Sequence, residues 1–130
     1  MTSPKGSYLT PTDAAKNGAR LLKEGRADVV KLEGGQRVAA HVQQMSDAGI
    51  AVIGHIGLTP QTYTALGGYR CQGKTAAAAV ELVKDAEALQ AAGCIAIVLE
   101  CIPDQLSRHI TETLRVPTIG IGAGPTTAGQ

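Results

Sequence analysis

The stretch Asp28-Val29-Val30-Lys31-Leu32-Glu33-Gly34-Gly35 combines three branched aliphatic side chains with a terminal pair of glycines. This combination predicts a buried strand that the glycine pair ends. Because side chains alternate between the two faces of a strand, Lys31 and Glu33 share one face near its end. An ammonium and a carboxylate are costly to bury in an aliphatic strand unless they serve each other or a ligand. The stretch therefore leaves two alternatives, a structural ion pair or part of a binding site.

The same strand pattern recurs downstream, and helical patterns separate the strands. Further strands are expected at residues 50–56, 94–101 and 118–121, and helices at residues 10–25, 36–48, 75–92 and 103–114. Alternation of strands and helices predicts an α/β fold with a parallel sheet covered by helices. Parallel crossovers are right-handed, so all the strand ends face the same way.

Polar residues follow this common edge of the expected sheet. His55 and Glu100 come near the ends of their strands, and Gly122-Ala123-Gly124 follows the last strand. The carboxyl ends of barrel strands are where (β/α)8 barrels place their chemistry, and a complete barrel needs about 250 residues. We therefore expect residues 1–130 to form a single partial TIM-barrel domain of about four to five consecutive β/α units.

Composition narrows the possible partners. The chain has 130 residues, 12 basic and 11 acidic side chains and a formal net charge of +1, which does not favour nucleic acid. The longest apolar run is too short to cross a bilayer, and no secretory signal is visible after Met1. Three cysteines without Cys-x-x-Cys spacing indicate a reducing compartment and no metal cluster. We expect a cytoplasmic or mitochondrial protein without a membrane partner.

Several residues have both an ordinary and a functional interpretation. His55 alone is more often a structural histidine than a ligand. Cys101 follows Glu100, and its parity in the strand predicts an inert thiol buried towards a helix. The Gly122-Ala123-Gly124 turn could cradle an anion, but it lacks the full dinucleotide fingerprint. The long glycine-rich segment at residues 59–74 is expected to be functional, whereas Tyr8 could equally cover the barrel or touch a ligand.

Five motifs occur in order along the chain. They are Val30-Lys31-Leu32-Glu33-Gly34-Gly35, Gly54-His55-Ile56-Gly57-Leu58-Thr59-Pro60-Gln61, Gly67-Gly68-Tyr69 with Gln72-Gly73, Val98-Leu99-Glu100-Cys101-Ile102-Pro103 and Ile119-Gly120-Ile121-Gly122-Ala123-Gly124. Together they resemble the ketopantoate hydroxymethyltransferase (3-methyl-2-oxobutanoate hydroxymethyltransferase) family of the pantothenate pathway. The resemblance covers nearly the whole chain, from Pro4 to Gln130.

This resemblance implies a Mg²⁺-dependent barrel enzyme. The family moves a hydroxymethyl group from the co-substrate 5,10-methylenetetrahydrofolate to 3-methyl-2-oxobutanoate and forms 2-dehydropantoate. By resemblance, Glu100 is the catalytic proton acceptor, Lys31 binds the 2-oxo acid, and Glu33 contributes to the metal site. His55 lies in a motif that lines the site and is placed with the substrate-binding residues.

The chain also departs from the family pattern. Family members use two aspartates as principal magnesium ligands, and the first belongs to a segment that this sequence lacks. The second aligns near Thr2, where family members carry Asp-Leu-Pro. The resemblance therefore predicts a partial chain in which Glu33 is the one recognisable magnesium ligand.

Other functions stay open at this point. The chain could be a non-catalytic remnant or a fragment that complements the rest of a barrel. It could also be another barrel lyase of the phosphoenolpyruvate/pyruvate type. An open partial barrel exposes strand edges and apolar surface, so we expect self-association or a homo-oligomer.

Overall fold

A computed structural model describes residues 1–4, 6–57 and 73–130 of the chain. In these residues four strands form one sheet in the order β1-β2-β3-β4, and every neighbouring pair is parallel. The strands are β1 (Val30–Glu33), β2 (Val52–Gly57), β3 (Ala96–Glu100) and β4 (Thr118–Ile121). The expected α/β fold, a partial (β/α)8 barrel, is confirmed, and the strands lie where the sequence pattern predicts them.

One helix precedes β1, and the other helices occupy the intervals between the strands. They are α1 (Pro11–Lys23), a 3-10 turn η1 (Gln36–Val38) continuous with α2 (Ala39–Asp47), α3 (Ala76–Ala92) and α4 (Asp104–Thr113). The hydroxyl of Thr10 accepts a hydrogen bond from the Asp13 N–H at 3.0 Å, as expected for a helix cap. None of the helices in the described ranges is long and apolar enough to cross a membrane.

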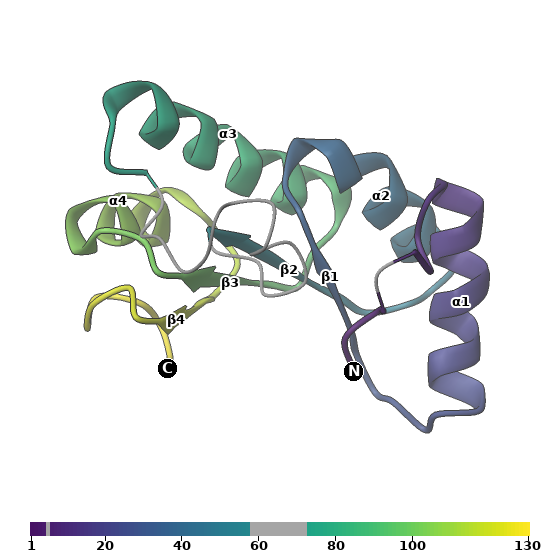
Figure 1. Cartoon of the computed structure of the whole chain (residues 1–130). Coiled ribbons are helices and arrows are strands. Elements are labelled where there is room, and N and C mark those ends of the chain that lie inside the picture. Colours follow the sequence, from purple (N-terminus) through teal and green to yellow (C-terminus); the bar gives the residue numbers. More distant parts are fainter. Residues whose placement is uncertain (5, 58–72) are drawn as a thin grey trace.

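The core lies between the sheet and its helices. Helices α2, α3 and α4 cover one face of the sheet, and α1 packs beside α2 (Figure 1). Fully buried side chains of the strands, such as Leu32 and Leu99, meet Met45 and Leu89 from the helices. Burying an aliphatic side chain of this size stabilises the fold by about 1.5–3 kcal/mol. Leucine, isoleucine, valine and alanine make up most of this core, and Met45 and Cys94 complete it.

Short segments at both ends of the chain add to the two sheet edges. The Ser3 N–H donates to the Lys31 carbonyl at 2.9 Å, and the Lys31 N–H donates to the Met1 carbonyl at 2.7 Å. At the other edge, the Gly120 N–H donates to the Gly129 carbonyl at 2.8 Å. The edges of β1 and β4 are thus partly covered, a pairing that the sequence pattern did not predict.

The second face of the sheet carries no helix of the described chain. In-register pairing places Glu33, His55, Val98 and Ile119 in one row across the four strands. Since in-register partners in a sheet point to the same side, all four face away from the helices. This helix-free face corresponds to the interior of a barrel, and it holds the residues that the sequence singled out.

Two further expectations from the sequence concern Cys101 and the glycine-rich segment at residues 59–74. Cys101 is only half-buried, with a left-handed backbone (φ 53°), so the prediction of a buried strand thiol is wrong. The strand ends at Glu100 and the chain turns, so strand parity no longer sets the direction of the next side chain. Most of the glycine-rich segment at 59–74 lies outside the described residues.

Candidate functional site

Lys31 and Glu33 lie on the helix-free face of β1, as the sequence predicts. Leu32 between them points into the core and is fully buried, while Lys31 stays half-exposed and Glu33 is 6% exposed. Lys31 forms no ion pair with Glu33 or with any other described carboxylate. The structural ion pair, the ordinary alternative for this stretch, is therefore not what the fold contains. The ammonium remains available to an anion near the site.

His55 and Glu100 meet directly. The Nε2 atom of His55 lies 2.9 Å from the Oε2 atom of Glu100, and the side chains are 1% and 15% exposed, respectively. His55 is also the in-register neighbour of Glu33 on β1. Glu100 lies two strands away from Glu33 and two residues further along the sheet. With strands about 4.8 Å apart and a rise of about 3.3 Å per residue, their backbones are roughly 12 Å apart, and His55 lies between them.

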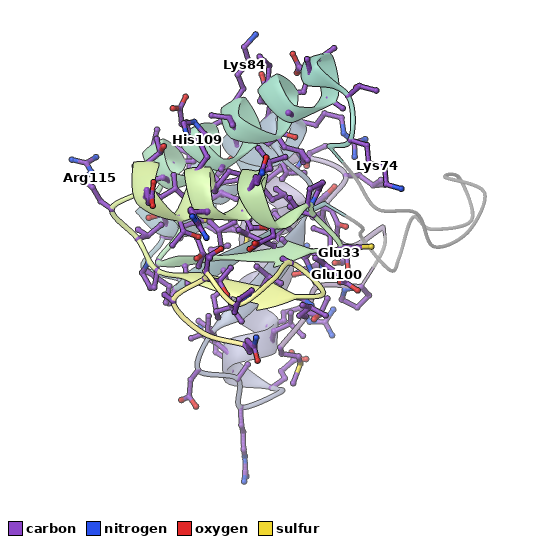
Figure 2. All side chains as sticks on the ribbon, turned by 90° about the vertical axis from the view of Figure 1, so that its left-hand side faces the viewer. Glu33, Lys74, Lys84, Glu100, His109 and Arg115 are labelled. Carbon is purple, nitrogen blue, oxygen red and sulfur yellow. The ribbon has the colours of Figure 1, made fainter. Side chains whose placement is uncertain are left out.

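The same end of the sheet holds both carboxylates. Figure 2 shows Glu33 and Glu100 at one end, whereas Arg115 lies at the opposite end and His109 lies on helix α4. Glu33, His55 and Glu100 lie in the carboxyl-terminal halves of β1, β2 and β3, respectively. Of the residues predicted to gather on one rim with the glycine-rich turn, Glu33, His55 and Glu100 lie at this end of the helix-free face, and Lys31 shares the face two residues before Glu33 along β1.

Tyr8 is a neighbour of this site that the sequence did not assign. Burial and the negative charge of Glu33 raise the pKa of the Tyr8 hydroxyl, and the positive charge of Arg37 lowers it by less. The hydroxyl is therefore protonated at neutral pH and can donate a hydrogen bond. Tyr8 lies before α1 and Glu33 ends β1, so the influence of Glu33 on Tyr8 depends on packing and left no signal in the local pattern.

The glycine turn after β4 is not an open anion cradle. A Cβ atom at Gly124 would lie 2.3 Å from an oxygen of the Asp104 side chain. Asp104 also accepts a hydrogen bond from the Thr126 hydroxyl at 3.1 Å. A carboxylate against this turn repels an anion, so the weak phosphate-type interpretation of Gly122-Ala123-Gly124 loses its support.

The described residues do not make a complete magnesium site. No group of three or more histidine, cysteine or acidic side chains in the described ranges is placed to hold a metal ion. Glu100 is engaged by His55, which leaves Glu33 as the acidic candidate on β1. Magnesium needs six oxygen ligands in near-ideal octahedral geometry. One carboxylate of this chain would have to be supplemented by substrate and water.

Comparisons with known proteins identify the family. A family model described as ketopantoate hydroxymethyltransferase matches residues 2–130. A 3-methyl-2-oxobutanoate hydroxymethyltransferase from Heliobacterium modesticaldum is 55% identical over 128 residues, which are 98% of this chain and 46% of that protein. The Thermobifida fusca protein of the same name has the same identity and coverage. The Emericella nidulans protein is 50% identical over 98% of this chain and 37% of its own length.

A solved structure supports the fold alone. An isomerase from Streptomyces coelicolor A3(2) superposes with a TM-score of 0.58 at 18% identity, over 92% of this chain and 31% of that one. The chain thus spans less than half the length of the curated relatives that it matches. Since the family model covers nearly every residue, this chain belongs to the ketopantoate hydroxymethyltransferase family.

Proposed function

We propose that this chain carries part of the active site of a transferase acting on a 2-oxo acid. The transferred group is a hydroxymethyl group from 5,10-methylenetetrahydrofolate, and the acceptor is 3-methyl-2-oxobutanoate. The product, 2-dehydropantoate, is an intermediate of pantothenate biosynthesis. The family membership supports this reaction, and the observation that carries it is the Glu100 carboxylate at the end of β3, on the face shared with Lys31.

Each proposed role is the one that the family resemblance implies, and the charge and position of the side chain support it. Glu100 is the general base that removes the proton from C3 of the 2-oxo acid. Lys31 offsets the negative charge of the substrate as the enolate develops. Glu33 is the residue through which this chain would contribute to binding Mg²⁺, although the described residues alone do not complete such a site. We place His55 near the substrate, next to the base.

Proton removal can be measured without the folate. Incubation with 3-methyl-2-oxobutanoate in deuterated water, with and without Mg²⁺, should place deuterium at C3, detected by NMR. Because a general base typically contributes 10²–10⁴-fold, Glu100→Gln should lower the exchange rate by roughly that factor. Glu112→Gln, on the exposed surface of α4, is the matched control and should exchange at the wild-type rate. Absence of exchange at every pH would remove this activity from the chain.

A second candidate is a complementing fragment that is active only with the rest of a barrel. This chain covers only 46% of the Heliobacterium modesticaldum and Thermobifida fusca relatives, which favours testing this candidate. Mixing this chain with segments of the Heliobacterium modesticaldum relative that supply the remaining strands should then restore exchange. If the chain exchanges deuterium alone at the rate of the mixture, complementation is not its function.

A further inference from the structure

The contact between His55 and Glu100 is the best-defined polar interaction on the helix-free face. The His55 ring is 1% exposed, and its Nε2 atom lies 2.9 Å from Oε2 of Glu100. A carboxylate oxygen can only accept a hydrogen bond, so Nε2 carries the hydrogen and donates it. Among the described residues no second hydrogen-bond partner of the Glu100 carboxylate is found.

The strand register explains why His55 performs this contact. The in-register partner of Glu100 on β2 is Gly57, which has no side chain. His55 is two residues earlier on the same face of β2 and reaches diagonally to Glu100. A side chain at position 57 could not replace it, because a Cβ atom there would lie 2.2 Å from the Glu100 carbonyl oxygen. Since Gly57 has no side chain, His55 is the residue of β2 whose side chain supports the Glu100 carboxylate.

We propose that His55 is a positioning residue that holds the Glu100 carboxylate in its reactive orientation and does not itself bind the substrate. By donating to Oε2, it fixes the side-chain torsions of Glu100 and turns Oε1 towards the substrate. This inference rests on the proposed function, in which Glu100 is the base. A glutamate at a strand end otherwise samples several rotamers. Holding the carboxylate in the reactive rotamer lowers the entropic part of the activation barrier.

The proton balance of the step involves Glu100 and not His55. The C3–H bond of the 2-oxo acid breaks, its proton bonds to Oε1 of Glu100, and the electron pair forms the C2–C3 double bond of the enolate. The negative charge moves to the C2 oxygen. The hydrogen on Nε2 stays on His55 throughout and keeps Oε2 in place.

Two substitutions separate positioning from substrate binding. In His55→Gln the side-chain amide can present an N–H close to the position of Nε2, whereas His55→Leu has no donor. We expect His55→Leu to lower kcat for C3 deuterium exchange by roughly 10- to 100-fold, with KM within a factor of about two of wild type. His55→Gln should recover most of that loss. His109→Leu, an exposed position on α4, should match the wild type.

Other kinetic outcomes would overturn the proposal. A rise in KM at nearly constant kcat would mean that His55 binds the substrate directly. An unchanged rate in His55→Leu would mean that Glu100 needs no partner. A loss in His55→Gln equal to that in a folded His55→Leu, with circular dichroism matching wild type, would mean that the donor hydrogen bond is not what matters.

A spectroscopic measurement tests the pairing even if the wild-type chain shows no exchange, the result that counts against the proposed function. Proton–nitrogen correlation NMR of the imidazole should show a hydrogen on Nε2 that exchanges slowly with water. In Glu100→Ala this exchange should accelerate at least tenfold while the fold is retained. A neutral ring with its hydrogen on Nδ1, or an Nε2–H exchange rate unaffected by Glu100→Ala, would overturn the proposal independently of activity.

Discussion

Thr2 lies beside Lys31 in the short parallel bridge at the edge of β1. In-register partners share a face, so a carboxylate at position 2 would stand on the helix-free face, next to the row that contains Glu33. The family resemblance of the sequence implies an aspartate near this position in family members. Position 2 is therefore where an added carboxylate tests the expected metal site.

We predict that Thr2→Asp increases the affinity for a divalent cation. The added charge supplies a second oxygen ligand, and the dissociation constant for Mn²⁺, used as a magnetic probe for Mg²⁺, should fall by roughly tenfold. Electron paramagnetic resonance titration measures free Mn²⁺ directly. Thr12→Asp, which adds the same charge on the exposed surface of α1, is the matched control. Equal binding by Thr2→Asp and Thr12→Asp would show that position 2 is not part of a metal site.

Cys94 gives a prediction that depends on pH. Burial raises the pKa of its thiol from 9.0 to about 12, and a hydrogen bond from the backbone of Gly54 opposes this rise by less. The thiol therefore has a higher pKa in the folded protein than in the unfolded chain. Its contribution to the free energy of unfolding is fully present below pH 9 and is lost as the pH rises from 9 to 12. The free energy of unfolding should therefore fall over this window. Urea titrations of wild type and Cys94→Ala measure it, and the variant should show a smaller decrease.

Thiol labelling offers an independent check on the same residue. The thiolate is the reactive form, so buried Cys94 should react with iodoacetamide far more slowly than half-buried Cys101 at pH 8. Peptide mass spectrometry separates the two sites. Comparable labelling rates in the folded protein would contradict the burial of Cys94.

At the scale of the elements, the end of β2 is built around Gly57. This residue has a left-handed backbone (φ 87°), and a Cβ atom would lie 2.2 Å from the carbonyl oxygen of Glu100. Gly49, between α2 and β2, has nearly the same backbone (φ 82°) but no heavy atom within 4 Å of its Cβ position. The two glycines therefore share the cost of the backbone conformation and differ in the space around them.

We predict that Gly57→Ala destabilises the fold more than Gly49→Ala. A left-handed alanine costs about 1–2 kcal/mol in either place. The clash with β3 should add about 1–3 kcal/mol at position 57. Chemical denaturation of both variants measures the difference in the free energy of unfolding. Equal losses in the two variants would mean that the strand ends can separate without cost.

For the molecule as a whole, the helix-free face is expected to determine self-association in solution. Ile121, at the end of β4, shares this face with Glu100 and is 48% exposed. Val80 is similarly exposed, at 53%, but belongs to α3 on the other side of the sheet. Both positions thus present an aliphatic side chain to solvent from opposite layers.

We predict self-association through the helix-free face. Light scattering over a range of concentrations should show a mass above that of the 13.3 kDa monomer. Ile121→Asp should weaken the association, because it places a charge among apolar groups, while Val80→Asp should not. A cooperatively folded monomer at every concentration, or equal effects of the two substitutions, would contradict this prediction.

Local sequence signals alone predict the order and the approximate bounds of the strands and helices. Spacing of aliphatic residues, the Thr10 cap and the glycines after helices are local signals, and they act within a few residues. Local signals also placed Lys31 and Glu33 on one face and Glu100 at a strand end. The alternation of strands and helices then implied a parallel sheet with its polar ends together, and the observed topology agrees.

Which of these polar groups are in contact depends on how the elements pack. The hydrogen bond from His55 to Glu100 and the pairing of Thr2 with Lys31 join residues that are far apart in the chain. Such contacts depend on strand register and on packing, and a shift of one residue would turn each side chain to the other face. Periodicity specifies which face a residue occupies within its own element, whereas its partner on that face is fixed only when the elements pack.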